Sequence, residues 1–343
     1  MKNFSKNLVV LGIETSCDET AAAVYTTDRG ILSNKLFSQI EQQKIYGGVV
    51  PEIGSRTQLE KINTIVQEAL QAAQVTLEQI DVIAVTSKPG LAGSLLVGVC
   101  FAKALAWTLK KPIVGVNHLE GHAFSSFIEH NPPFPHICLT ASGGHTSLYL
   151  MEDFGKYTTI ASTGDDAAGE AFDKIAKLIG LPYPGGPEVE KMARLVDFKD
   201  FFEYPRGKKP ILEFSFSGLK TAVLYDLVKR NLYDLKTKTL LDQSPELKMQ
   251  VSSSLLVAMR DIFISKLELA LKAYPEIKSV SFVGGVACNK YLKAALAEFC
   301  QMHNLQYFTP AGQYCTDNAA MIALVGHYMA QTGQLSDLSL DIY

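Results

Sequence analysis

One order of elements occurs twice in this chain of 343 residues, and it limits the folds that the chain can adopt. The first copy starts with an apolar strand at 81–86 and a glycine loop at 89–93, followed by a helix that ends at Leu109. A short strand at 113–116 comes next, and a second helix begins near Asn117. The later copy runs in the same order through 280–283, Gly284-Gly285, 289–300, 306–309 and a helix that begins near Thr316-Asp317. This order is typical of α/β domains with parallel strands.

A predicted hairpin precedes each copy. Apolar runs at 8–13 and 21–25 flank the polar loop 14–20, and runs at 137–140 and 146–150 flank Ser142-Gly143-Gly144-His145. We therefore predict a duplicated α/β domain, with an N-terminal lobe over 1–131 and a C-terminal lobe over 132–315. The prolines of 132–135 mark the linker, because they cannot continue a helix or a ladder. We expect 162–275 to form a largely helical insertion and 316–343 to pack back near the interface.

The composition excludes several classes of protein. With 47% hydrophobic and 20% charged residues, the chain has enough apolar surface for sizeable cores and is not disordered. A net charge of −3 is unlike that of a protein that holds nucleic acid by bulk charge, although a local basic patch is compatible with it. The six cysteines form no C-x-x-C pair, which indicates reduced thiols in a reducing compartment. The apolar stretch 95–109 is interrupted by Gly98 and Lys103, so we expect a soluble, cytoplasmic protein without a membrane partner.

The pair His118 and His122 is the first candidate for chemistry. If 118–122 is helical, both imidazoles lie on one face at the spacing of metal ligands. The segment is not the metalloprotease motif H-E-x-x-H, because Leu119 occupies the position of the glutamate. Alone, such a pair is more often one capping and one packed histidine. Asp317 stands at the equivalent place in the later copy, and two pseudo-symmetric lobes facing each other would bring the three residues together. Two histidines and a carboxylate suit iron(II) or zinc; the alternative for Asp317 is an ordinary helix N-cap.

Several segments are candidates for binding a nucleotide. Ser142-Gly143-Gly144 offers unobstructed backbone N–H groups, and Gly284-Gly285 leads to a helix N-terminus near Asn289 that would attract an anion. The like charges of Asp166, Glu170 and Asp173 fall on one predicted helical face, which favours a role such as binding ribose hydroxyls or a metal. A solvated first turn explains Asp166 equally well but not Asp173. Residues 184–187 form either a plain turn or a loop that a ligand approaches.

Eight segments together resemble one family: G-I-E-T-S-C-D-E-T (12–20), Y-G-G-V-V-P-E (46–52), H-L-E-G-H (118–122), S-G-G-H-T (142–146), D-D-A-A-G-E-A-F-D-K (165–174), Y-P-G-G-P (183–187), F-S-F-S-G-L-K-T (214–221) and C-T-D-N-A-A-M-I-A (315–323). They are similar to the motifs of the bacterial tRNA N6-adenosine threonylcarbamoyltransferases. The resemblance implies two actin-like (ribonuclease H-like) lobes with a ligand cleft between them. It also implies transfer of a threonylcarbamoyl group from threonylcarbamoyl-AMP to N6 of the adenosine 3′ of the anticodon, in tRNAs that read codons beginning with adenine.

The resemblance also assigns roles to residues. It implies that His118, His122 and Asp317 bind one divalent metal per subunit, with Fe²⁺ favoured and Zn²⁺ the alternative. It places the adenylate or ATP against Thr140, Ala141, Ser142, Gly143, Gly144, Asp173, Gly186 and Asn289, and Glu19 on the phosphate or tRNA side. The implied partners are tRNA, a paralogous actin-like subunit and a small ATPase. The helix predicted over 56–74 becomes the candidate for pairing with the paralogue, although a face packed on a sheet is the simpler interpretation of its apolar spacing.

Lys88 and Cys288 depart from the family pattern, and the chain stops at Tyr343 without the basic, tryptophan-containing tail of many members. We expect these departures to alter the loop after 81–86, the adenylate contacts near Asn289 and any contacts that depend on the tail. Two other functions are alternatives to the transferase. A metalloprotease is disfavoured by the missing H-E pair, and a non-catalytic actin-like module that binds ATP is disfavoured by the retained metal trio and acidic segment.

Overall fold

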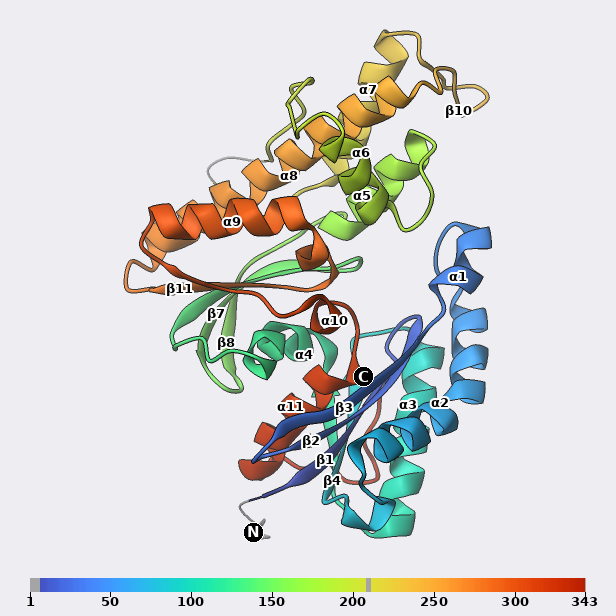
Figure 1. Cartoon of the computed structure of the whole chain (residues 1–343), viewed down its shortest axis with the longest axis vertical. Helices are drawn as coiled ribbons and strands as arrows, with labels where there is room; N and C mark the ends of the chain where they lie inside the picture. The colour runs from blue at the N-terminus through green and yellow to red at the C-terminus, as the bar shows by residue number, and fades with distance from the viewer. Residues whose placement is uncertain (1–6, 208–210, 343) are drawn as a thin grey trace. The chain divides into compact units, whose positions relative to one another are not determined.

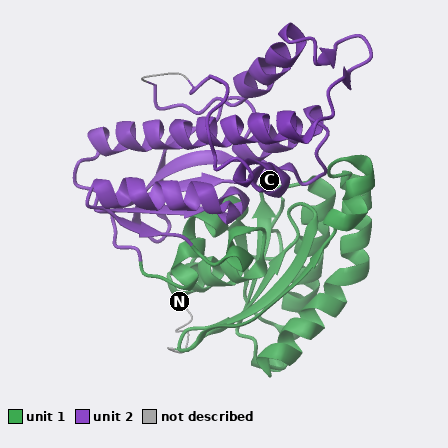
Figure 2. Cartoon of the chain, turned by 45° about the horizontal axis from the view of Figure 1, so that its top comes forward, with its two compact units in different colours: residues 1–131, 310–343 green, residues 132–309 purple. Residues whose placement is uncertain are grey.

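The structure is a computed structural model that describes residues 7–207 and 211–342, so Tyr343 lies outside the described residues (Figure 1). The chain forms two compact units. Unit 1 consists of residues 1–131 and 310–343, and unit 2 consists of residues 132–309 (Figure 2). The second unit is thus inserted in the sequence of the first, and the segment that begins at residue 310 belongs to unit 1.

Unit 1 is a five-stranded sheet with helices on both faces. Its strands are β1 (Val9–Glu14), β2 (Glu19–Thr26), β3 (Gly30–Ser38), β4 (Val82–Lys88) and β5 (Ile113–Asn117). Its α-helices are α1 (Ile40–Gln43), α2 (Pro51–Ala73), α3 (Ala92–Leu109), α4 (His118–Phe124), α10 (Gly312–Cys315) and α11 (Ala319–Gln331). Short 3₁₀ helices occupy η1 (Lys44–Tyr46), η2 (Leu77–Gln79) and η3 (Ser125–Ile128).

Unit 2 contains a second five-stranded sheet and most of its helical mass between the third and fourth of those strands. The sheet strands are β6 (His136–Ala141), β7 (Thr146–Asp153), β8 (Lys156–Ser162), β11 (Ser279–Val283) and β12 (Gln306–Phe308). The helices are α5 (Ala168–Leu178), α6 (Gly185–Arg194), α7 (Ser217–Lys229), α8 (Pro245–Ala273), η4 (Gly285–Cys288) and α9 (Lys290–Met302). A small hairpin pairs β9 (Tyr233–Asp234) with β10 (Thr239–Leu240).

The two sheets have the same topology. Unit 1 has the strand order β3-β2-β1-β4-β5, and unit 2 has the matching order β8-β7-β6-β11-β12. In both, the first three strands pair antiparallel and the last two pair parallel. The duplicated plan predicted from the hairpins and crossovers is therefore confirmed. Because β1, β4 and β5 run parallel, their carboxyl ends meet at one edge of the sheet, as do those of β6 and β11, and such edges are where α/β proteins bind ligands.

The third strand of each sheet was not predicted. Strands β3 and β8 each form one edge of their sheet and are largely half-buried or exposed along their length. An edge strand needs no continuous apolar run, because only part of it faces the core. The periodicity on which strand prediction depends is therefore weak in these two segments.

The faces of the sheet in unit 1 are covered by different helices (Figure 1). Helices α2 and α3 cover one face, where their apolar side chains pack with those of β1, β2 and β4. Helix α11 covers the other face and lies so close to β1 that a Cβ atom on Gly12 would be 2.5 Å from the carbonyl oxygen of Ala319. Gly326 of α11 likewise has no room for a Cβ atom, because Ala84 of β4 fills that space. Two glycines, one on each partner, thus set the distance between α11 and the sheet.

Helix α3 alone among the described helices is long and apolar enough to cross a membrane, with a mean hydropathy of 1.6 over 18 residues. One side of the helix packs against the sheet through Leu95, Val99, Ala102 and Ala106. This is the packing of a core helix in a soluble-type α/β fold. The apolar stretch recognised in the sequence starts at residue 95, whereas the helix begins earlier, at Ala92.

His327 of α11 makes stability depend on pH. The ring is buried, lies 4.9 Å from the ring of Tyr25, and its Nδ1 has no hydrogen-bond partner among the described residues. Burial lowers the pKa of His327 to about 4 from an ordinary value of 6.5. Between these values the unfolded chain binds a proton that the folded chain does not, so stability is lost as the pH falls through this window.

We predict that the free energy of unfolding of the metal-free protein decreases between pH 6.5 and pH 4.5, with this residue contributing at most about 1.4 kcal/mol per pH unit. In His327→Phe, which retains an aromatic ring but cannot be protonated, that part of the slope is absent. Urea unfolding of both proteins at several pH values measures the difference. Parallel pH dependences for the two proteins would contradict the prediction.

Candidate metal centre and nucleotide pocket

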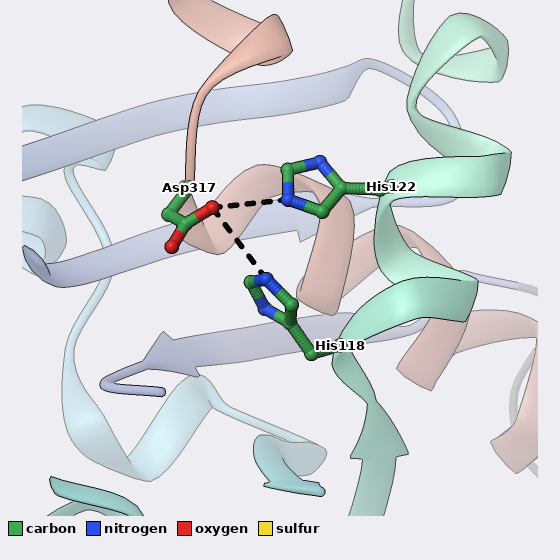
Figure 3. Close-up of side chains that lie close together, drawn as sticks. All are labelled: His118, His122 and Asp317. Carbon is green, nitrogen blue, oxygen red and sulfur yellow. Dashed lines mark hydrogen bonds and ion pairs between the residues drawn. The ribbon is translucent and has the colours of Figure 1, made fainter. Parts of the chain in front are cut away.

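The side chains of His118, His122 and Asp317 converge in unit 1 (Figure 3). Their ligand atoms all lie within 4.8 Å of one another. Nε2 of His122 is 3.0 Å from Oδ1 of Asp317, and Nε2 of His118 is 3.5 Å from the same oxygen. Two ligand atoms bound to one metal at about 2.1 Å each lie roughly 3.0–3.4 Å apart, so the spacing suits a shared metal ion.

The local sequence explains how each ligand is positioned. Asn117 caps α4, accepting hydrogen bonds from the backbone N–H groups of Leu119 and Glu120, so His118 occupies the first helical position and His122 lies one turn later. Asn318 caps α11 by accepting a hydrogen bond from the N–H of Met321. Two alternatives from the sequence are therefore wrong, namely that one of the histidines caps a helix and that Asp317 does. Asparagines cap both helices, and Asp317 instead points toward the histidines (Figure 3).

The route by which the trio assembles also differs from the one expected. From the sequence we expected two pseudo-symmetric lobes facing each other to bring the three residues together. All three residues instead belong to unit 1, because the chain returns to that unit at residue 310 and α11 packs on its sheet. Asp317 reaches His122 across 195 residues of sequence, and both residues belong to unit 1.

Carboxylates around His118 favour positive charge at this site. Burial lowers the pKa of His118, but the nearby carboxylates of Asp317 and Glu14 outweigh it and raise the pKa to about 9. A bound cation would be stabilised by the same two carboxylates. The donor set of two imidazoles and one carboxylate, held in a largely buried site with negative potential, fits a divalent transition metal.

Glu19 lies close to this centre at the start of β2. Its carboxyl accepts a hydrogen bond from the hydroxyl of Ser38. Burial together with the charges of Asp317 and Asp18 raises the pKa of Glu19 well above its ordinary value. The preceding loop is held by Gln58 of α2, whose amide donates to the carbonyl oxygens of Thr15, Cys17 and Glu19.

Unit 2 has a pocket of about 370 Å³ at the carboxyl ends of β6 and β11. Its lining consists of Gly143, Gly169, Phe172, Asp173, Gly186, Pro187, Glu190, Gly285, Val286, Cys288 and Asn289. Four predicted nucleotide-binding residues, Gly143, Asp173, Gly186 and Asn289, thus come together there from four separate segments. Of the others, Thr140 and Ala141 are buried within β6, and neither Ser142 nor Gly144 lines the pocket.

Two carboxylates give this pocket its chemistry. Asp173 uses Oδ1 to accept a hydrogen bond of 2.6 Å from the N–H of Gly185, and burial raises its pKa. Glu190 accepts from the N–H of Lys290, at the N-terminus of α9, through both carboxylate oxygens. The helix end that was expected to attract a ligand anion therefore already holds a carboxylate of the protein itself. Sequence analysis missed Glu190, because no motif distinguishes it from other helical glutamates.

The acidic segment is less repulsive than its sequence suggests. Helix α5 begins only at Ala168, so Asp166 precedes it rather than sharing a helical face. Lys174 pairs with Asp166 at 2.6 Å and with Glu170 at 2.9 Å, which offsets their charges. Asp165 accepts hydrogen bonds from the hydroxyls of Ser215 and Ser217, and these bonds outweigh desolvation and lower its pKa to about 2. The prediction that Asp166 shares a helical face with Glu170 and Asp173 is therefore wrong, and Asp173 is the member that lines the pocket.

Comparison with known proteins identifies the family. The model of the TsaD family, described as tRNA N6-adenosine threonylcarbamoyltransferase, matches residues 30–324. A protein of that name from Caldicellulosiruptor saccharolyticus is 45% identical over 337 residues, which cover 97% of this chain and 96% of the relative. The corresponding protein of Geotalea uraniireducens is 46% identical over 335 residues, covering 97% and 95%. The chain belongs to the tRNA N6-adenosine threonylcarbamoyltransferase family.

Solved structures of much lower sequence identity share the fold of this chain. Full-length HypF aligns with a TM-score of 0.61 at 14% identity, over 96% of this chain and 55% of HypF. Component A of the Acidaminococcus fermentans (R)-2-hydroxyglutaryl-CoA dehydratase aligns with a TM-score of 0.56 at 14% identity, over 94% and 99%. These likenesses, with the duplicated sheets, confirm the predicted actin-like α/β fold.

Asp317 and Asn318 are neighbours with separate roles, and substitution distinguishes them. We predict that Asp317→Ala loses most of the bound metal while its metal-free form unfolds at nearly the same temperature as the wild type. We predict that Asn318→Ala retains the metal but loses about 1 kcal/mol of stability with its cap. Metal content by mass spectrometry and thermal unfolding measure both effects. Full metal content in Asp317→Ala would show that this carboxylate is not a ligand.

Proposed function

We propose that this protein transfers a threonylcarbamoyl group from threonylcarbamoyl-AMP to N6 of the adenosine 3′ of the anticodon, in tRNAs that read codons beginning with adenine, and releases AMP. The observation that carries the proposal is the convergence of His118, His122 and Asp317 in a chain that matches this family over nearly its whole length. The target adenosine lies in a single-stranded loop, so the enzyme does not have to open a duplex to reach it.

We further propose that the three side chains hold one divalent metal per subunit, iron(II) in preference to zinc. His118 and His122 would supply imidazole nitrogens and Asp317 an oxygen, a set common to iron(II) and zinc sites with open positions. When bound, the metal would supply Lewis acidity toward the carbonyl or phosphate of an acyl-adenylate. The charge of Glu14, like that of Asp317, favours a cation at this site.

The pocket of unit 2 is proposed to hold the nucleoside part of the adenylate. Asp173 and Glu190 present carboxylate oxygens to the pocket, and such oxygens accept hydrogen bonds from ribose hydroxyls. The glycines at 143, 186 and 285 leave space for a ligand, since a Cβ atom on any of them would meet nothing within 4 Å. The acidic lining supports binding of the sugar there rather than of the phosphate. Cys288, which departs from the family pattern, also lines this pocket.

Reconstitution tests the proposed reaction. The protein is incubated with unmodified tRNA, threonine, bicarbonate, ATP and the partner proteins, and the tRNA nucleosides are analysed by mass spectrometry. Threonylcarbamoyladenosine is expected with the wild type and is expected to fall to background in the variant that carries both His118→Ala and His122→Ala. Absence of the modified nucleoside with the wild type would overturn the proposal.

The nucleoside assignment predicts a loss of affinity. In Asp173→Asn an amide replaces the acceptor that faces the pocket, and we expect AMP to bind about 10- to 100-fold more weakly, the range for losing a hydrogen bond to a charged group. Isothermal titration measures the change, and Glu298→Gln, an exposed substitution on α9, is the matched control. Unchanged AMP binding in Asp173→Asn would place the nucleoside elsewhere.

The proposed protein partners are a paralogous actin-like subunit and a small ATPase, and the first has a candidate docking face. Helices α2 and α3 pack together on one side of the sheet. On α3, exposed Leu96, Cys100 and Trp107 follow one another at helical spacing, and Leu59 of α2 is also exposed. We name these four residues the α2–α3 face. An apolar stripe of this kind on two packed helices fits a partner that presents helices of its own.

A tRNA substrate and six free cysteines support a cytoplasmic location.

We predict that Leu59→Glu weakens binding of the paralogous subunit at least about tenfold, because it places a charge in an apolar interface. Met302→Glu on α9 is the control: Met302 is 67% exposed, close to the 68% of Leu59, but lies in unit 2. Size-exclusion chromatography and titration calorimetry measure complex formation. Equal binding by the two variants would move the partner away from this face.

A further inference from the structure

A buried carboxylate touches one of the two candidate metal-binding histidines but not the other. Oε2 of Glu14 is 3.1 Å from Nδ1 of His118. Nδ1 of His122, by contrast, has no hydrogen-bond partner among the described residues. Glu14 itself is fully buried at the carboxyl end of β1. The two histidines of the proposed centre therefore differ in the hydrogen bonding of Nδ1.

We propose that Glu14 is a positioning residue for the metal centre: it accepts the Nδ1 proton of His118 and thereby aims the unprotonated Nε2 at Asp317 and His122. This inference rests on the proposed metal site and goes beyond it, since Glu14 is not a ligand. An imidazole ring that binds a metal through one nitrogen usually donates the N–H of the other to a carboxylate or carbonyl, which fixes both the tautomer and the ring orientation.

The surroundings of Glu14 fix which of its atoms faces His118. The backbone N–H of Ser16 donates to Oε1, and the hydroxyl of Thr86 donates to Oε2, each at 2.5 Å. A backbone N–H can only donate, so the position of Oε1 must be an acceptor in every variant. Oε2 is thus directed at His118. The pairing of β1 with β4 holds Thr86 beside the same oxygen.

This arrangement makes Glu14→Gln informative. The carbonyl oxygen of the glutamine is required opposite the N–H of Ser16, so its NH₂ group takes the place of Oε2. That NH₂ group would donate to Nδ1 of His118 and leave the proton on Nε2, where the metal has to bind. The substitution changes almost no volume but reverses the hydrogen bond.

The side chain of Ser16 is the competing explanation, because its Oγ is also 3.1 Å from Nδ1 of His118. A carboxylate accepts a hydrogen bond more strongly than a neutral hydroxyl does, so Glu14 is expected to dominate. Ser16→Ala removes this hydroxyl and keeps the backbone N–H that holds Glu14. It is therefore the matched control.

The experiment measures Co²⁺ affinity of the full-length protein by competition with a chelator, together with the visible absorption bands of the bound Co²⁺. We expect Glu14→Gln to bind Co²⁺ about 10- to 100-fold more weakly than the wild type, the range found for second partners of metal-binding histidines. We expect Ser16→Ala to lose only about threefold, as for one neutral hydrogen bond. Thermal unfolding of the metal-free proteins controls for folding.

A double-mutant cycle separates positioning from general damage. In a His118→Ala background, Glu14→Gln should cause no further loss of Co²⁺ affinity, because the residue on which Glu14 acts is gone. An equal loss in both backgrounds, or wild-type affinity and spectrum in Glu14→Gln, would overturn the proposal for Glu14. Failure of the wild type to bind Co²⁺ would instead overturn the metal centre itself.

Discussion

Helix α11 lies against strand β1 at a distance that leaves no room for a side chain on Gly12. The same helix contacts β2, β4 and β5, so it spans most of one face of the sheet. Asp317 stands two residues before α11 begins, and Asn318 caps the helix. The position of this carboxylate is therefore set by how deeply α11 packs. The candidate metal centre therefore depends on a backbone contact at Ala319, two residues after Asp317.

Both candidate sites follow from the same property of the repeated sheet. Parallel strands end at a common edge, and the residues that follow them are brought together without being adjacent in sequence. In unit 1 this edge collects Glu14 and His118, from the ends of β1 and β5. In unit 2 it collects Gly143 and Gly285, from the loops after β6 and β11. One topology used twice gives a site of imidazoles and carboxylates in one unit and a glycine-lined pocket in the other.

The sequence predicted those parts of the fold whose signal is local. Apolar runs located the buried strands β1, β4, β6 and β11, whereas the more exposed β3 and β8 carry no such run. The spacing of His118 and His122, together with the equivalent place of Asp317 in the later copy, predicted a metal site, and the family resemblance implied that all three are ligands. From the sequence, Glu14 was predicted only as part of a polar loop. Its contact with His118 depends on how β1 pairs with β4 and on where β5 ends, and neither can be read from the residues around Glu14. Glu190 was missed for the same reason, since its partner Lys290 is 100 residues away.

The insertion of unit 2 within unit 1 has a consequence for synthesis of the chain. A ribosome makes His118 and His122 first, then all of unit 2, and only afterwards Asp317 and the helix that packs on Gly12. Unit 2 is continuous in sequence and can complete its sheet while unit 1 still lacks one covering helix. During that interval the two histidines have no carboxylate from residue 317 beside them. The order of translation thus delays a complete set of candidate metal ligands until all of unit 2 has been made.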